Sequence, residues 1–159
     1  MHISTVSSSV KIAHDLNGGP TLVDGDSFGI SVGQIGDLNR DGVPDLAVGA
    51  SADDSGRGAL YTLLLNADGS VGSRVKIANG AGGGPDLVNN DYFGRSATGV
   101  GDLNRDGVPD LAVGAPGDDT GGATNSGALY ILFMNAAGSV GSRVKIANGA
   151  GGGPTLANE

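Results

Sequence analysis

The chain has 159 residues, including 31 glycines, three Phe, three Tyr, no Trp and no Cys, and its formal net charge is −8. This length suits one ordinary domain, and the lack of cysteine excludes disulfides and thiol catalysis. The negative charge disfavours nucleic acids and anionic membrane surfaces as partners, and no apolar run is long enough to insert into a membrane.

The sequence is periodic from its first residues onward. Lys11-Ile12-Ala13 returns 65 positions later as Lys76-Ile77-Ala78, and again as Lys145-Ile146-Ala147 after a further 69 positions. The additional residues of the second interval fall within Gly117–Gly127. An insertion confined to one place predicts an exposed loop there.

Eight short apolar segments predict β-strands, four in each repeat. They are Phe28–Ile35, Asp45–Ala50, Leu60–Leu65 and Arg74–Ala78, then Phe93–Val100, Asp110–Ala115, Leu129–Met134 and Arg143–Ala147. The second and third strands of each repeat are almost wholly apolar, which indicates burial on both faces. Helical periodicity is absent. Repeated four-stranded antiparallel units of this kind predict an all-β fold with two β-propeller blades.

One nonapeptide, Asp-Leu-Asn-Arg-Asp-Gly-Val-Pro-Asp, occurs as residues 37–45 and again as residues 102–110. Its oxygen-bearing side chains at positions 1, 3, 5 and 9 can converge on one point, because alternate positions of a tight loop point inward. Ca²⁺ suits such a cluster, since it takes about 6–8 oxygen ligands and tolerates irregular geometry. The loop is not an EF-hand, because position 12 holds Val48 and Val113 in place of Glu. An Asx-rich turn that binds nothing is the alternative.

Three motifs occur twice in the same order. They are Phe28-Gly29 and Phe93-Gly94, the Asp-rich loop, and Gly114-Ala115-Pro116, which in the first copy is Gly49-Ala50-Ser51. This order resembles the FG-GAP repeat, which builds the β-propeller of integrin α-subunits and many bacterial surface proteins. The resemblance implies one Ca²⁺ per repeat, two per chain, in the hairpin loop between the first two strands. The implied ligands are Asp37, Asn39, Asp41, Asp45 and the Val43 carbonyl, and Asp102, Asn104, Asp106, Asp110 and the Val108 carbonyl.

Two blades do not close a propeller, which needs about 4–8. We interpret residues 1–25 as a partial repeat with a last strand and a linker, 26–90 as the first blade, and 91–159 as the second blade with a linker. The chain therefore looks like part of a longer array, natural or designed. We expect head-to-tail assembly of copies into a ring, with three copies favoured over four. The extra strand expected at residues 5–13 would join a blade edge or replace Arg143–Ala147 of a neighbour.

Other polar groups carry weaker signals. Asp53-Asp54 and Asp118-Asp119 could form a second metal or ligand site or an acid–base pair, but a solvated polar turn is favoured. The glycine-rich residues 79–85 and 148–154 lack the lysine and helix of a phosphate loop, so they are predicted to be linkers between blades. No nucleophile–base–acid set is evident, so an enzyme is not expected.

These signals favour a calcium-stabilised structural, adhesion or protein-interaction scaffold. An extracellular or cell-surface location is expected, although no signal peptide is visible. The alternative is a lectin that binds a glycan between its blades, with Tyr61, Tyr92 or Tyr130 stacked on the sugar.

Overall fold

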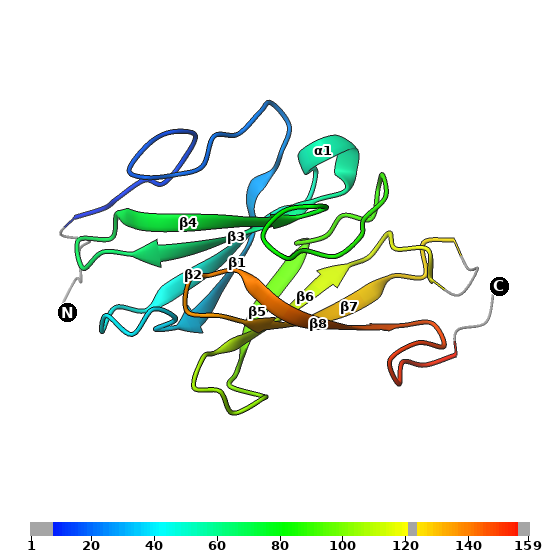
Figure 1. Cartoon of the computed structure of the whole chain (residues 1–159). Helices are drawn as coiled ribbons and strands as arrows, with labels where there is room; N and C mark the ends of the chain where they lie inside the picture. Colours follow the sequence, from blue (N-terminus) through cyan, green and yellow to red (C-terminus); the bar gives the residue numbers. More distant parts are fainter. Residues whose placement is uncertain (1–7, 121–123, 156–159) are drawn as a thin grey trace, which may run out of the picture.

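The computed structural model describes residues 8–120 and 124–155. It shows two four-stranded antiparallel sheets with strand orders β1-β2-β3-β4 and β5-β6-β7-β8 (Figure 1). The strands are β1 Phe28–Gly36, β2 Asp45–Ala50, β3 Ala59–Leu65, β4 Val71–Ala78, β5 Ser96–Gly101, β6 Asp110–Ala115, β7 Ala128–Met134 and β8 Val140–Ala147. The predicted all-β fold with two blade-like sheets is confirmed. Over the described ranges the one α-helix is a single turn, α1 Asp53–Gly56, and no helix there is long and apolar enough to span a membrane.

The starts of β5, β4 and β8 differ from the sequence prediction. β5 begins at Ser96, because Phe93 lies fully buried and its backbone forms an isolated parallel bridge with Gly58 of the first sheet. β4 and β8 begin earlier than predicted, at Val71 and Val140. Both valines are buried and pair with the last residue of the preceding strand across a register shift.

The two sheets pack face to face, and both contribute to one apolar core. The first sheet and its loop supply Ile35, Leu38, Ala47, Leu60, Leu64 and Ile77, and the second supplies Leu111, Val113, Ala115, Tyr130, Leu132 and Met134. The sheets meet most closely at β1 and β5. A Cβ on Gly33 would lie 2.7 Å from the carbonyl oxygen of Ala97, and one on Gly99 would lie 2.5 Å from that of Gln34. Glycine permits this close backbone approach, because it has no Cβ to meet the facing carbonyl.

Residues 8–27 lie over the outer face of the first sheet, away from the second sheet (blue, Figure 1). Ile12 and Leu22 pack there against Val48, Tyr61 and Leu63. The strand expected at residues 5–13 is wrong where the structure describes it. Residues 8–13 contain only an isolated bridge at residue 13, because no neighbouring strand pairs with them. Residues 5–7 of that prediction lie outside the described residues.

Burial of the central strands depends on the sheet. β2 and β3 contain no exposed residue, so the prediction of burial on both faces holds there. It is wrong for β7, where exposed Leu129 and half-buried Ile131 and Phe133 alternate with buried Tyr130 and Leu132. The buried face of β7 packs on the first sheet, and no described residue covers its other face in the same way.

Candidate metal centres

The two nonapeptides form the hairpin loops between β1 and β2 and between β5 and β6. Each loop turns through left-handed backbone conformations. The φ angle is 64° at Arg40 and at Arg105, 88° at Gly42 and 85° at Gly107. Glycine adopts such angles without a steric penalty, which is why the sixth position of the loop suits it. The sequence prediction of two alike turns between first and second strands is confirmed.

The side chains at positions 1, 3 and 5 of the first loop turn inward. The Oδ1 atoms of Asp37 and Asn39 both accept a hydrogen bond from the backbone N–H of Asp41, at 3.0 and 3.1 Å. The second oxygen of Asp37 accepts one from Gly42 at 2.8 Å. Asp41 itself accepts one from the Val43 N–H at 2.8 Å. The oxygen atoms of the first and third positions therefore gather around one backbone nitrogen.

The second loop has the same arrangement. The N–H of Asp106 donates to Asp102 at 3.1 Å and to Asn104 at 3.0 Å. Gly107 donates to the other oxygen of Asp102 at 2.8 Å, and Val108 donates to Asp106 at 2.8 Å. Since the two loops have different surroundings, this agreement shows that the nine residues determine the loop conformation.

The aspartate at position 9 has a role that sequence reasoning missed. Asp45 is fully buried at the start of β2. One of its oxygens accepts a hydrogen bond from the Leu38 N–H at 2.8 Å, and the other accepts one from the Leu65 N–H at 3.0 Å. Asp110 accepts the equivalent pair in the second sheet at 2.9 and 3.0 Å. This carboxylate therefore ties the loop to the end of the third strand.

The donor set of each loop fits a hard cation. Carboxylate, amide and carbonyl oxygens are the ligands that Ca²⁺ prefers, and the three carboxylates bring a formal charge of about −3 to each loop. Within residues 8–120 and 124–155, however, no three acidic or histidine side chains already stand together as a metal cluster. The loop oxygens point inward but bond to backbone N–H groups, so calcium ligation by the ten implied residues stays a prediction.

A second polar cluster lies where the sequence predicted a solvated turn. Asp53 is buried, and the Nζ atom of Lys76 lies 2.7 Å from each of its carboxylate oxygens. The hydroxyl of Tyr61 lies 3.4 Å from Asp53, and Lys76 also sits over the Tyr61 ring, 5.8 Å from its centroid. The solvated turn is therefore wrong for Asp53. Its neighbour Asp54 is exposed and pairs with Arg57 at 2.9 Å.

The second repeat has a matching cluster around buried Asp118. Lys145 Nζ lies 2.7 Å from Oδ1, the Tyr130 hydroxyl donates to Oδ2 at 2.8 Å, and the Thr120 hydroxyl also donates to Oδ1. Burial acts to raise the pKa of Asp118, but the hydrogen bonds from Lys145, Thr120 and Tyr130 outweigh it and hold the pKa below its ordinary value. Burial, with the adjacent carboxylate, raises the pKa of Tyr130. Asp118 is thus a structural anion at neutral pH.

Asp91 lies beside this cluster, but fewer hydrogen bonds stabilise its carboxylate than stabilise that of Asp118. It is buried, and its Oδ2 atom accepts a hydrogen bond from the Val88 N–H at 2.8 Å. Its Oδ1 atom has no hydrogen-bond partner among the described residues. Burial, with the nearby charge of Asp118, raises the pKa of Asp91. Asp91 and Asp118 both line an open cavity of about 330 Å³.

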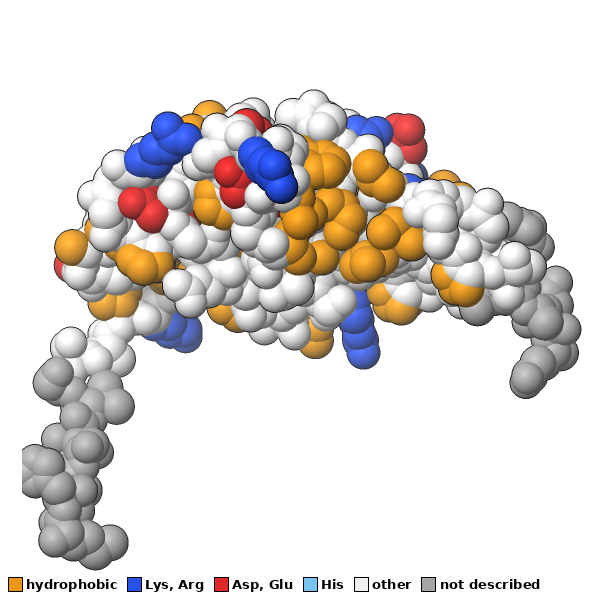
Figure 2. All heavy atoms as spheres, turned by 90° about the horizontal axis from the view of Figure 1, so that it is seen from below, with side chains coloured by type: hydrophobic (Ala, Val, Ile, Leu, Met, Phe, Trp, Pro, Cys, Tyr) orange, Lys and Arg blue, Asp and Glu red, His pale blue; other side chains and the backbone are white. Residues whose placement is uncertain are grey.

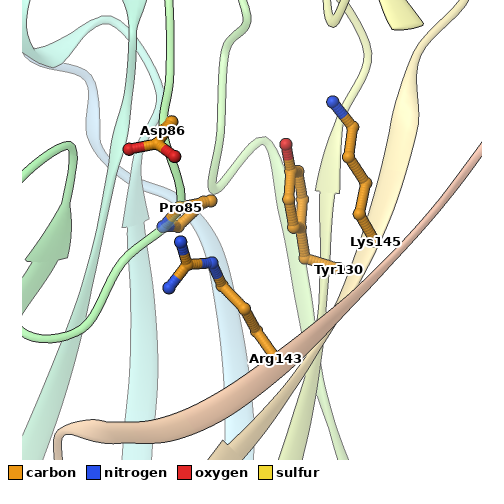
Figure 3. Close-up of a pocket in the computed structure, with 5 residues that line it drawn as sticks. All are labelled: Pro85, Asp86, Tyr130, Arg143 and Lys145. Atoms are coloured by element: carbon orange, nitrogen blue, oxygen red, sulfur yellow. The ribbon is translucent and has the colours of Figure 1, made fainter. Parts of the chain in front are cut away.

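A neighbouring cavity of about 280 Å³ is lined by Pro85, Asp86, Tyr130, Arg143 and Lys145 (Figure 3). Arg143 extends toward the Pro85–Asp86 segment and donates to the Gly83 carbonyl at 3.2 Å. The Tyr130 ring packs edge-on against Phe93 with centroids 5.6 Å apart, and Tyr61 packs likewise against Phe28 at 5.7 Å. Tyr61 and Tyr130 are buried, so neither offers a sugar an open ring face, whereas Tyr92, the third tyrosine of the lectin alternative, is 37% exposed.

Comparison with known proteins gives a consistent result. The model of the FG-GAP repeat matches residues 28–63 and 93–132. Integrin alpha-6 of Homo sapiens is 44% identical over 91 residues, which cover 57% of this chain and 7% of the integrin. Integrin alpha-2 of Bos taurus is 29% identical over 119 residues, 74% of this chain and 10% of the integrin. Integrin alpha-10 of Homo sapiens is 41% identical over 90 residues, 57% and 8% of the two chains. The chain spans a tenth or less of the length of these relatives.

Proposed function

We propose that this chain, two segments of which match the FG-GAP repeat, is a calcium-binding, integrin-like propeller module. It would act as a structural, adhesion or protein-interaction scaffold outside the cell or at its surface, and not as an enzyme. The observation that carries the proposal is the inward-facing oxygens of the two hairpin loops, which lie inside the matched repeats. The relatives are integrin alpha chains by name, and the burial of Tyr61 and Tyr130 gives no support to the sugar-binding alternative.

Bound calcium would stabilise the end of each sheet at which the hairpin loop lies. A bound ion supplies positive charge where three carboxylates per loop otherwise repel one another. The residues that would hold it in the first loop are Asp37, Asn39, Asp41, Asp45 and the Val43 carbonyl, and in the second Asp102, Asn104, Asp106, Asp110 and the Val108 carbonyl. Because Asp45 also accepts a hydrogen bond from β3, ordering of its loop stabilises the whole sheet end. Binding to the folded loops alone would stabilise the fold by about 2.7 kcal/mol at a hundredfold excess over Kd.

Isothermal titration calorimetry of the chelator-treated chain tests the proposal. We expect two Ca²⁺ per chain with Kd on the order of 10⁻⁴–10⁻³ M and a rise in melting temperature. Asp41→Ala and Asp106→Ala should each remove one site, and the double variant should remove both. Asp24→Ala is the control, since it deletes an exposed carboxylate outside both loops and should keep both sites.

Magnesium provides a further comparison. It demands near-octahedral geometry and gives up water reluctantly, so it should stabilise the chain less than calcium does at equal concentration. Equal stabilisation by the two ions would contradict the assigned ligand geometry. Absence of any calcium-dependent heat or melting shift at millimolar Ca²⁺ would refute the metal sites themselves.

A further inference from the structure

The outer face of the second sheet exposes side chains whose counterparts in the first sheet are buried. Leu38 has an exposed fraction of 0%, whereas Leu103, at the same position of the second loop, is 52% exposed. Leu60 of β3 is 0% exposed and its counterpart Leu129 of β7 is 40% exposed. We call this surface the open face, and it also contains Val100, Ala112, Ile131, Phe133, Val144 and Ile146. Figure 2, seen from the side of the second sheet, shows apolar side chains gathered in a patch.

The first sheet shows what such a face accepts. The face of the first sheet that corresponds to the open face packs against the second sheet and forms the main core. Three side chains also cross that boundary to donate to backbone carbonyls: Ser31 to Gly94 at 2.8 Å, Arg40 to Gly107 at 2.9 Å and Thr62 to Gly138 at 2.7 Å. The counterparts of Ser31 and Arg40 on the open face are Ser96 and Arg105, so most of this docking chemistry is present again.

At the other end of the molecule, residues 8–20 occupy the place of a fourth strand and linker from a preceding sheet. The side chain of Val10 lies 3.6 Å from the Cβ position of Gly69, as Val75 of β4 lies 3.4 Å from that of Gly138. The carbonyl of Asn17 accepts a hydrogen bond from Val71 at 3.0 Å, and Gly82 accepts the equivalent one from Val140 at 3.0 Å. The outer face of the first sheet is therefore shaped to receive a sheet, and only an edge of one now covers it. Ile30 and Val32 of β1 remain exposed there.

From these two faces we propose that a second copy of this chain binds head to tail. The open face of one copy would pack on the outer face of the first sheet of the next, as the two sheets pack within one chain. This inference goes beyond the proposed function, because it rests on sheet packing and not on calcium. Repetition of the contact closes a ring if the rotation allows, and three copies would give a ring of six sheets.

The contact requires one local rearrangement. β8 of one copy and residues 8–13 of the next are counterparts, so they compete for one position. β8 pairs with β7 from Ala147 to Val140, whereas residues 8–13 form no strand. In the assembly, residues 8–13 would therefore leave the first sheet of their own copy, and β8 of the neighbouring copy would take their place. Ile12 of that segment and Ile146 of β8 hold the equivalent place in their respective chains.

Light scattering across a concentration series tests the assembly. We expect the mass to rise from one chain toward three, and Leu129→Lys on the open face to shift this transition by at least tenfold in concentration. Lysine is chosen because the chain carries a net charge of −8, so the substitution lessens repulsion between copies. The control is Val88→Lys, at a 58% exposed linker position outside the open face. A folded monomer at all concentrations, or equal behaviour of the two variants, would overturn the proposal.

Disulfide trapping tests the direction of the contact, since the chain has no native cysteine. Within one chain, the Cβ of Thr62 lies 3.7 Å from the Cβ position of Gly138, within the range of about 3.5–4.5 Å that a disulfide needs. The counterpart pair between copies is Ile131 of one and Gly69 of the other. Single variants Ile131→Cys and Gly69→Cys, each first shown to fold by circular dichroism, should cross-link when mixed and not alone. Cross-linking of Ile131→Cys with itself would show a symmetric tail-to-tail contact and contradict the head-to-tail one.

Discussion

The ammonium group of Lys145 lies 2.7 Å from the carboxylate of Asp118, which is buried at the end of the second sheet. The two residues stand in different strands and connections, and Lys145 is itself partly exposed. Tyr130 and Thr120 complete the hydrogen bonds of this carboxylate. The pair recurs in the first sheet as Lys76 and Asp53 at the same distance. A buried anion of this kind is stable only while its partner remains in place.

Replacement of Lys145 should therefore destabilise the fold. Lys145→Met leaves Asp118 buried without its cation, and we expect a loss of about 1–3 kcal/mol in the free energy of unfolding. Because the pKa of Asp118 is depressed in the folded state, its contribution is complete above the unfolded pKa of about 3.9 and is lost as pH falls through the folded pKa. Urea unfolding at pH 7 and in the acid range checks this, since the difference from the original chain should shrink in acid. Lys11→Met, at the exposed counterpart position, should change little.

Asp91→Asn should act in the opposite direction. Burial raises the pKa of Asp91, so its ionisation destabilises the fold. This cost is absent below the unfolded pKa, grows as the pH rises toward the folded pKa and is complete above it. The amide keeps an acceptor for the Val88 N–H and removes the charge, so we expect a higher melting temperature at pH 7 and no gain in acid. Differential scanning calorimetry at both pH values measures this. Asp26→Asn is the matched control. Asp26 is also buried and accepts the same bond from Val23 at 2.8 Å, but among the described residues only Asp91 has a buried carboxylate oxygen without a hydrogen-bond partner, so an equal gain at Asp26 would contradict the explanation.

Gly49→Ala and Gly114→Ala form a matched pair at equivalent positions of β2 and β6. A Cβ on Gly49 would lie 1.9 Å from the backbone oxygen of Gly94, so the alanine would push the sheets apart at a cost of about 1–3 kcal/mol or more. A Cβ on Gly114 meets only the Ser96 side chain, at 2.4 Å for its hydroxyl oxygen, and that side chain can rotate. Thermal unfolding of dilute chains should show a marked loss for the first variant and a small change for the second. Equal losses would contradict the assigned packing.

Asp45→Asn separates the structural part of the loop from its metal-binding part. The amide cannot accept hydrogen bonds through its nitrogen, so either the Leu38 or the Leu65 N–H loses its buried partner. We expect a loss of about 1–3 kcal/mol even in the presence of chelator. Asp41→Ala should instead lose mainly the calcium-dependent part of the stability. Chemical denaturation of both variants with chelator and with calcium distinguishes them, and identical profiles would show that Asp45 has no role besides ligation.

Much of this protein follows from local sequence. The repeat, the strand centres and the hairpin turns are set by apolar runs and by turn residues, which act over a few positions. The loop at residues 37–45 is the clearest case, because its side chains bond to backbone groups of the same nine residues, and residues 102–110 repeat those bonds. The resemblance to FG-GAP repeats could be stated from such motifs alone.

Burial could not be predicted in this way, because it depends on which element lies on top. The sequence predicts that Asp53 is a solvated turn residue. In the fold, β4 places Lys76, which is 23 positions away in the chain, in contact with it. Leu38 and Leu103 have the same neighbours in sequence, yet the first is buried and the second is half exposed. A second sheet covers the first of them, and no described sheet covers the other. Local hydrogen bonds and turn geometry depend on the sequence of each repeat alone. Burial of a side chain depends on the packing of one repeat on another.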